Sequence, residues 1–397
     1  MLIKFKKTVK LPCLILLERL KKAPDLGPRV LFFSGGTALK KPCREIVKYT
    51  YNSIHIITPF DSGGSSAVLR KAFNVPAIGD IRNRLLTLAD RSYHGNPAVY
   101  ELFAYRFPKD GNLKVLHEEL DKMIVGEHPL ILPIPNPMQK IIQTHLEYFK
   151  SFMPKDFDLR KASIGNLILT SGYIDTQNSF DIILFTFSKL VRVLGIVKPI
   201  VNEDLHLITL LENETVLIGQ HRLTGKEDNP ISSKVKGIWL SKTKDSADKD
   251  SVKIETKMEH QLRDAELICY PMGSFYSSLI ANILPKGVGS SIKKNYCSKI
   301  YIPNTGTHDP EEFGMTINDK VMTLISYLTK DDPENIQPRD VLNFVLIDSK
   351  RGDYPGELEI KKLTKMGVNI IDTELISDQS YPFLDEKLLI PVIMSLT

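Results

Sequence analysis

Residues 29–59 read RVLFFSGGTALKKPCREIVKYTYNSIHIITP. The first part, 29–34, is a compact apolar run that predicts a buried strand, and the glycine pair at 35–36 ends it. Residues 38–49 can form a helix, and the isoleucine-rich residues 53–59 predict a second buried strand. Strand, glycine turn, helix and strand in this order indicate a βαβ unit, and hence a parallel sheet.

The rest of the chain continues this alternation. Helices are expected at 79–89, 113–124, 138–152, 163–171, 180–194, 274–283 and 319–328, and further strands at 265–270, 299–303 and 341–348. Apolar runs at 205–211 and 215–220 flank a polar turn and predict a β-hairpin. We therefore expect an α/β fold with a doubly wound, mostly parallel, Rossmann-like sheet, an inserted helical region and a β-hairpin.

The chain divides into three expected regions. Residues 1–28 form a leader with one short helix, 29–350 the α/β domain, and 351–397 a C-terminal extension packed on that domain. Within the domain, 91–160 is a helical insertion and 223–258 a polar surface excursion. The leader superficially resembles a signal peptide, but its apolar run is short and no small-residue cleavage site follows it.

The composition of the 397 residues is that of an ordinary globular protein, with 42% hydrophobic and 25% charged residues. The net charge of +5 suits a protein that binds anionic metabolites, but it is too small and too scattered to indicate a nucleic-acid binder. No apolar stretch approaches the ~18 residues of a membrane span, so no membrane partner is expected. The four cysteines are too far apart for a zinc ribbon or redox pair, which favours free thiols in the cytoplasm.

Four segments of small residues come just past predicted strands, with a fifth of the same layout. They are Ser34-Gly35-Gly36-Thr37, Asp61-Ser62-Gly63-Gly64-Ser65-Ser66, Gly79-Asp80-Ile81-Arg82-Asn83, Pro271-Met272-Gly273-Ser274-Phe275-Tyr276-Ser277-Ser278 and Asn304-Thr305-Gly306-Thr307. In open parallel sheets, ligands bind at this edge, where the strand order reverses. Because glycine amides and a helix N-terminus suit phosphate, segments 34–37 and 271–278 predict anion sites; plain glycine-rich turns are the alternative.

Some side chains in these segments offer more specific chemistry. Asp61 offers one hard oxygen ligand for Mg²⁺, and the neighbouring glycines and serines offer amides and hydroxyls for phosphate; a solvent-facing glycine- and serine-rich loop is the alternative. Asp80 can cap the helix that starts beside it, and Arg82 can pair with phosphate through two hydrogen bonds; capping and a surface ion pair are the alternative. Of the nine scattered histidines, His221 and His308 lie near strand ends, and no catalytic triad is evident.

Taken together, these segments resemble the CofD superfamily, which holds the 2-phospho-L-lactate transferases and the YvcK-like gluconeogenesis factors. The resemblance runs in order from about residue 29 to 330. The family's GGTG matches Gly35 to Ala38, its DDGGSSG-x-LR matches Asp61 to Arg70, and its GDIRN matches Gly79 to Asn83. Its S-x-GNL matches Ser163 to Leu167, its V-x-P matches Val197 to Pro199, and its PGS-x-Y-x-S matches Pro271 to Ser278. The family's asparagine after the next strand is Asn304. The longer chain indicates a bacterial CofD-like subgroup, and Ser62, Ala38 and Ala67 depart from the family pattern.

The resemblance implies a transferase that moves a phospho-lactate-type group from a nucleoside diphosphate conjugate (GDP- or UDP-type) to an acceptor hydroxyl with Mg²⁺. The implied catalytic residues are Asp61, Asp80 and Arg82, with Asp61 also holding the metal. The implied nucleotide or acceptor contacts are Gly35, Gly36, Thr37, Ser65, Ser66, Asn83, Asn166, Gly273, Ser274 and Asn304. The inserted region 91–160 is expected to select the acceptor substrate. The expected assembly is a homodimer. The alternative is a non-catalytic, YvcK-like regulator that binds a nucleotide sugar, which the loss of an acidic residue at Ser62 supports.

Overall fold

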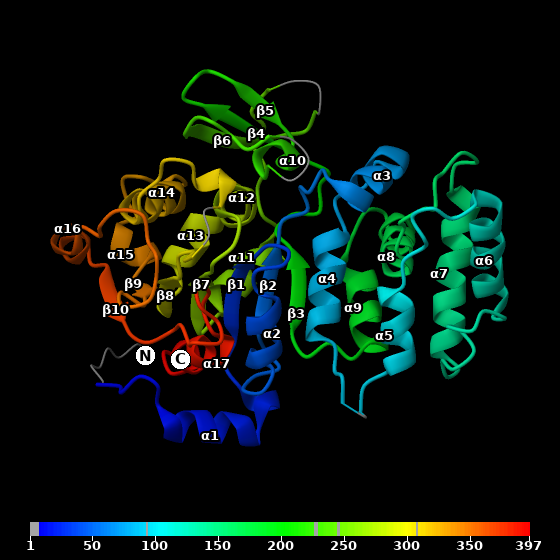
Figure 1. Cartoon of the computed structure of the whole chain (residues 1–397), viewed down its shortest axis with the longest axis horizontal. Coiled ribbons are helices and arrows are strands. Elements are labelled where there is room, and N and C mark those ends of the chain that lie inside the picture. Colours follow the sequence, from blue (N-terminus) through cyan, green and yellow to red (C-terminus); the bar gives the residue numbers. More distant parts are fainter. Residues whose placement is uncertain (1–7, 93, 226–228, 244–246, 307–308) are drawn as a thin grey trace.

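The computed structural model describes residues 8–92, 94–225, 229–243, 247–306 and 309–397 (Figure 1). At its centre is a seven-stranded parallel sheet in the order β10-β9-β8-β7-β1-β2-β3. The strands are β1 (Val30–Ser34), β2 (Ile54–Ile57), β3 (Ile196–Pro199), β7 (Leu267–Tyr270), β8 (Ser298–Tyr301), β9 (Phe344–Ile347) and β10 (Asn369–Asp372). The predicted doubly wound α/β fold is confirmed.

The strand order reverses between β1 and β7. The strands β2 and β3 extend the sheet on one side of β1, whereas β7 to β10 extend it on the other. Leu31 pairs with Ile54 of β2 and also with Ile268 of β7, so β1 is hydrogen-bonded to both halves. The carboxyl ends of β1 and β7 therefore lie side by side, and this is the place in an open sheet where a ligand crevice forms.

Alternate side chains of β1 serve the two faces of the sheet. Phe32 belongs to one buried core cluster and Phe33 to the other. Phe32 stacks on His55 with ring centroids 5.2 Å apart, and Phe33 stacks on Tyr270 at 5.6 Å. Because both faces are covered, the strand is continuously apolar rather than alternating, which is why the sequence identifies it readily.

Helices cover both faces. The first core cluster includes side chains from α1 (Leu14–Lys22), α2 (Lys40–Ile46), α3 (Gly64–Phe73), α4 (Gly79–Leu88), α5 (Pro97–Ala104), α6 (Leu113–Val125), α7 (Met138–Phe152), α8 (Ile164–Asp175), α9 (Asp181–Leu190) and α17 (Glu386–Met394). The second includes side chains from α11 (Thr256–Arg263), the π-helix η2 (Phe275–Ile280), α12 (Ala281–Ile283), α13 (Val288–Lys293), α14 (Ile317–Thr329), α15 (Pro338–Val341) and α16 (Ile360–Lys365). The short 3-10 turns are η1 (Pro24–Leu26) and η3 (Pro310–Glu312). Within the described ranges, no helix combines the length and apolar character needed to cross a bilayer.

A small antiparallel sheet stands over the carboxyl edge of the main sheet (Figure 1). Its order is β5 (Val216–Ile218), β4 (His206–Leu211) and β6 (Val235–Ser241). The pair β4–β5 is the predicted hairpin. In contrast, β6 lies inside 223–258, which the sequence predicts to be a polar excursion, and its Ile238 and Leu240 are buried. After β5, the short helix α10 (Gln220–Leu223) leads the chain toward the end of β1.

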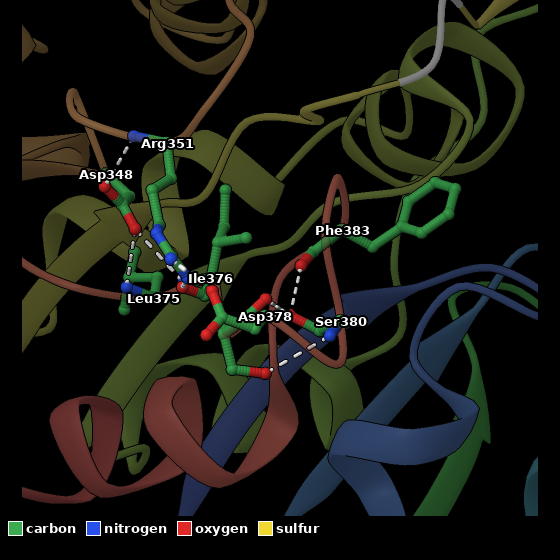
Figure 2. A network of polar contacts seen from close by, with 8 residues as sticks. Asp348, Arg351, Leu375, Ile376, Asp378, Ser380 and Phe383 are labelled. Carbon is green, nitrogen blue, oxygen red and sulfur yellow. Dashed lines mark hydrogen bonds and ion pairs between the residues drawn. The ribbon is translucent and has the colours of Figure 1, made fainter.

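One buried carboxylate fastens the segment after β9 (Figure 2). Asp348 accepts hydrogen bonds from the backbone N–H groups of Arg351 at 3.1 Å, Leu375 at 2.9 Å and Ile376 at 3.1 Å. The Arg351 guanidinium donates to the carbonyl of Ile376 at 2.9 Å. The strand β10 pairs with β9, so the region 351–397 supplies an edge strand to the main sheet as well as packing on it.

Candidate functional site

A cavity of about 160 Å³ lies at the carboxyl ends of β1 and β7. We call it the switch-point cavity. Its lining residues are Gly35, Gly36, Thr37, Ala38, Leu39, Asp61, Gly63, Asp80, Gln220, His221, Thr224, Met272, Gly273, Ser274 and Ser278. They come from the loops after β1, β2 and β7, from α4, and from α10 and the residue after it. The cavity thus gathers the predicted site residues Gly35, Gly36, Thr37, Asp61, Asp80, Gly273 and Ser274.

Two close approaches and a buried arginine shape the loop after β1. A Cβ on Gly35 would overlap Ser278 Oγ, and a Cβ on Gly36 would lie 2.8 Å from Asp80 Oδ1. Arg84, which is 1% exposed, donates to the Gly35 carbonyl at 2.8 Å and to the Gly36 carbonyl at 3.3 Å. Arg84 therefore fixes both peptide groups of the loop, and glycine is required where the loop meets the π-helix.

The loop after β2 presents Asp61. Its Oδ1 accepts the backbone N–H of Gly63 at 3.0 Å, and no described residue bonds Oδ2. The buried Arg70 donates to the carbonyls of Phe60 and Asp61 at 3.1 Å each, and pairs with Asp204 at 2.6 Å. Because Arg70 holds the backbone on both sides of the Asp61 side chain, this carboxylate is positioned with one oxygen left for a ligand.

His221, on the cavity wall, is paired with Ser62. Ser62 Oγ accepts the backbone N–H of His221 at 3.2 Å and lies 2.7 Å from Nδ1 of the same residue. Since this oxygen already accepts one N–H, its own proton can donate to Nδ1, and the ring proton of a neutral His221 is then on Nε2. Ser62 thus orients an imidazole, a role the sequence does not reveal.

Three of the predicted site residues lie away from the cavity, in a buried group between α4 and α8. Arg82 is 5% exposed and bonds to Ser163 Oγ and, at 2.6 Å, to Asn83 Oδ1. Burial lowers the pKa of the Arg82 guanidinium to about 10. Asn166 is fully buried in the first turn of α8. Arg82 is therefore too deeply buried to clamp a phosphate in the switch-point cavity, and its hydrogen bond to Ser163, the cap residue of α8, ties the two helices together.

Ser66 and the start of α4 also differ from the sequence-based expectation. Ser66 is buried, and its Oγ lies against the Cα of Gly79. No side-chain cap begins α4, since Ile78 occupies the cap position and Asp80 lies inside the first turn. The side chain of Ser65 and the residues Thr307 and His308 lie outside the described part of the chain.

The loop after β7 is held by an amide and capped by carboxylates. Asn304 accepts the N–H of Gly273 at 2.8 Å and donates to the Gly273 carbonyl at 2.7 Å, so its side chain positions the loop. Further on, Asp309 accepts the N–H of Phe275, and Glu311 accepts two more N–H groups, from residues 276 and 277. The helix N-terminus predicted to be an anion cradle is therefore largely filled by the chain's own carboxylates, which leaves Gly273 and Ser274 at the cavity.

These carboxylates are buried unusually deeply. Burial and, to a smaller extent, the negative charge of the neighbouring Asp309 raise the pKa of the Glu311 carboxyl to about 8. Burial and the charge of Glu312 raise the pKa of Asp309 to about 6. Lys320 pairs with Glu312 at 2.8 Å with both side chains buried. The cluster is thus a charged brace behind the loop after β7, and its ionisation depends on pH.

No three described histidine, cysteine, aspartate or glutamate side chains are grouped so as to hold a metal ion by themselves. Asp61 and Asp80 do line the same cavity. Mg²⁺ in proteins commonly uses one or two carboxylates together with the phosphates of a ligand. The residues present therefore fit a magnesium ion that arrives with a phosphorylated ligand.

Fold and cavity define the class: a doubly wound α/β protein whose candidate site lies at the strand-order reversal between β1 and β7. The model of the family described as 2-phospho-L-lactate transferase CofD matches residues 30–376, and the chain belongs to this family. The match begins with β1 and ends after β10, so it spans the whole main sheet.

Relatives agree with this assignment, and a solved structure shares the fold. The chain is 25% identical to the gluconeogenesis factor of Bacillus subtilis over 361 residues, which cover 88% of this chain and 92% of that protein. It is 26% identical to the gluconeogenesis factor of Halalkalibacterium halodurans over 356 residues, which cover 88% and 90%. A crystal structure of a UPF0052-family protein from Bacillus halodurans shares the fold, with a TM-score of 0.66, 22% identity and coverage of 93% of this chain and 99% of that one.

Proposed function

We propose that the protein is a CofD-like transferase. It binds the diphosphate of a nucleoside diphosphate conjugate in the switch-point cavity and moves a phospho-lactate-type group to an acceptor hydroxyl. The observation that supports this best is the convergence of two glycine loops with Asp61, Asp80 and His221 on one cavity. Glycine loops next to helix starts suit phosphate, and the carboxylates and imidazole supply metal and proton chemistry.

The protein's own groups divide the work. The backbone of Gly35 to Thr37 and of Ser274 receives the two phosphates, and Gly273, whose N–H is held by Asn304, leaves room for them. The Nε2–H of His221 donates to a phosphate oxygen. Arg84 and Asn304 act indirectly, because each holds the peptide groups of one loop by hydrogen bonds.

The transfer breaks the diphosphate bridge. The acceptor oxygen forms a bond to the phosphorus that carries the lactate-type group, the bond from that phosphorus to the bridging oxygen breaks, and a nucleoside monophosphate leaves. Asp80 takes the proton of the acceptor hydroxyl. Asp61 would hold Mg²⁺ together with the ligand phosphates, and the ion would offset charge on the leaving phosphate.

The test measures binding of GDP, UDP and a UDP-sugar by calorimetry, with and without Mg²⁺. We expect a nucleoside diphosphate to bind more tightly with Mg²⁺. In the presence of Mg²⁺, Asp61→Asn should weaken nucleoside diphosphate binding about tenfold or more. The reason is that a hydrogen bond or contact to a charged group is worth about 1.5–3 kcal/mol. The matched control is Asp110→Asn, which changes an exposed aspartate outside the cavity.

Two results would contradict the proposal. If the UDP-sugar bound best and Mg²⁺ made no difference, the site would be that of a nucleotide-sugar regulator. If Asp61→Asn and Asp110→Asn behaved alike, Asp61 would have no metal role.

A further inference from the structure

A second and larger cavity, of about 670 Å³, lies away from the switch-point cavity. Its walls are β6, residues 249–253, the segment from α12 to α13, and the end of α14. The volume is within the ~300–1,000 Å³ typical of sites for small organic ligands. None of its lining residues belongs to the switch-point cavity.

Rings and apolar side chains form part of the wall. Leu240 and Ile283 are buried, and the rings of Trp239 and Tyr327 lie among the lining residues. The indole Nε1–H of Trp239 donates to the Ala247 carbonyl at 2.9 Å, and Tyr327 Oη accepts the backbone N–H of Ile238 at 3.2 Å. Both rings are therefore held by hydrogen bonds before any ligand arrives, which lowers the entropy cost of binding a ring against them.

Five lysines from separate parts of the chain line the same cavity: Lys249, Lys253, Lys286, Lys294 and Lys330. Its three acidic residues already have partners within the chain. Asp250 accepts a backbone N–H from Lys242, Glu259 pairs with Lys253 at 3.6 Å, and Asp331 accepts the N–H groups of Gly287 at 2.9 Å and Ser290 at 3.1 Å.

Four of these lysines, all except Lys253, make no ion pair with any described residue. The pKa of Lys330 is lowered by partial burial of its ammonium group and by the nearby positive charge of Lys249, so the two ammonium groups repel one another. Lys330 also lies over the Tyr327 ring, with Nζ 5.1 Å from the centroid. The cavity has five lysines against three acidic residues, and this surplus of positive charge favours an anionic ligand.

We propose that this cavity binds a phosphorylated small molecule with a ring, the ring against Trp239 and Tyr327 and the phosphate among Lys249, Lys294 and Lys330. Lysine binds phosphate as a point charge from a flexible stem, so several lysines can converge on one group. The volume fits a molecule of metabolite size rather than a polymer. This site is separate from the one assigned to the proposed transfer reaction, and either can fail without the other.

The chain offers a direct probe, because Trp239 is its only tryptophan. Titration with phenyl phosphate, followed by tryptophan emission and calorimetry, should give a saturable change, and inorganic phosphate should bind more weakly. The double variant Lys249→Gln/Lys330→Gln should weaken phenyl phosphate binding about tenfold or more. The matched control Lys361→Gln/Lys365→Gln removes the same charge from α16 and should leave binding unchanged.

The proposal fails if emission does not saturate, or if both double variants weaken binding equally. It also fails if a single-stranded oligonucleotide binds tightly in competition with phenyl phosphate, since the lysines would then serve a nucleic acid. All of the substituted lysines are exposed, so the variants should fold, which their thermal unfolding midpoints verify. His221→Gln, in the switch-point cavity, should leave the emission response unchanged.

Discussion

At Gly35 the backbone passes so close to Ser278 that there is no room for a Cβ. We expect Gly35→Ala to lower the free energy of unfolding by about 1–3 kcal/mol, the usual cost of overpacking, and to weaken nucleotide binding because the loop must move. The double variant Gly35→Ala/Ser278→Gly should recover much of this stability. Urea unfolding measures the change, and Gly237→Ala, where the nearest atom lies 3.9 Å from the new Cβ, is the control. An unchanged stability in Gly35→Ala would show that the two segments yield easily.

Some residues of the candidate site can be predicted from the sequence, and others cannot. Gly35 and Asp61 were predictable because a glycine or an acid after a strand has a local meaning. Arg84 was not, because it lies within a helix and its partners are the carbonyls of residues 35 and 36. Likewise, Glu311 caps N–H groups 34 residues earlier in the chain, and no local pattern announces such a contact.

Among the elements, the π-helix η2 has its first N–H groups bonded to Glu311, a carboxylate whose charged form is destabilised by burial. Glu311 has a pKa of about 8 in the folded protein, against an ordinary value of 4.5. Between these values the native state holds more protons than the unfolded state, so this group makes stability fall as pH rises from about 4.5 to about 8. Glu311→Gln keeps the shape and removes the titration. We expect its stability to decline less over this range, with an advantage of about 3–6 kcal/mol over the wild type above pH 8.

Urea unfolding at a series of pH values measures this difference. Glu357→Gln, an exposed carboxylate, should follow the wild-type curve. Parallel curves for Glu311→Gln and the wild type would mean that Glu311 is ionised throughout and that its three hydrogen-bond donors outweigh its burial.

Elements also differ in how well the sequence predicts them. The apolar strands β1, β2, β7, β8 and β9 and the long helices were expected near their observed bounds. The edge strand β3 was missed: it is four residues long, ends in Pro199 and is only partly buried, so it lacks the continuous apolar run of a central strand. The strand β6 was also missed, because the charged residues around it give 223–258 the composition of a polar surface segment.

On the scale of the whole molecule, the first described helix and the last helix lie together on one face of the sheet. The backbone N–H of Cys13 donates to Ser395 Oγ at 2.8 Å, and α17 packs in the same core cluster as α2. The last third of the chain forms the β7 side of the switch-point cavity and then supplies β10, the edge strand of the sheet. The site is therefore built from both halves, and its integrity should depend on how firmly the C-terminal region is held.

Asp348 is the residue that tests this dependence, because it is 2% exposed and accepts N–H groups from both ends of the segment it fastens (Figure 2). We expect Asp348→Ala to cost about 3 kcal/mol or more, since several buried donors lose a charged acceptor. The control Asp378→Ala removes an exposed partner of Arg351 and should cost less than about 1 kcal/mol. Hydrogen exchange should show the loss of protection beginning in β10 and spreading to β9. If protection fell only in the 375–376 turn, the C-terminal region would be an appendage, and the sheet up to β9 would be stable without it.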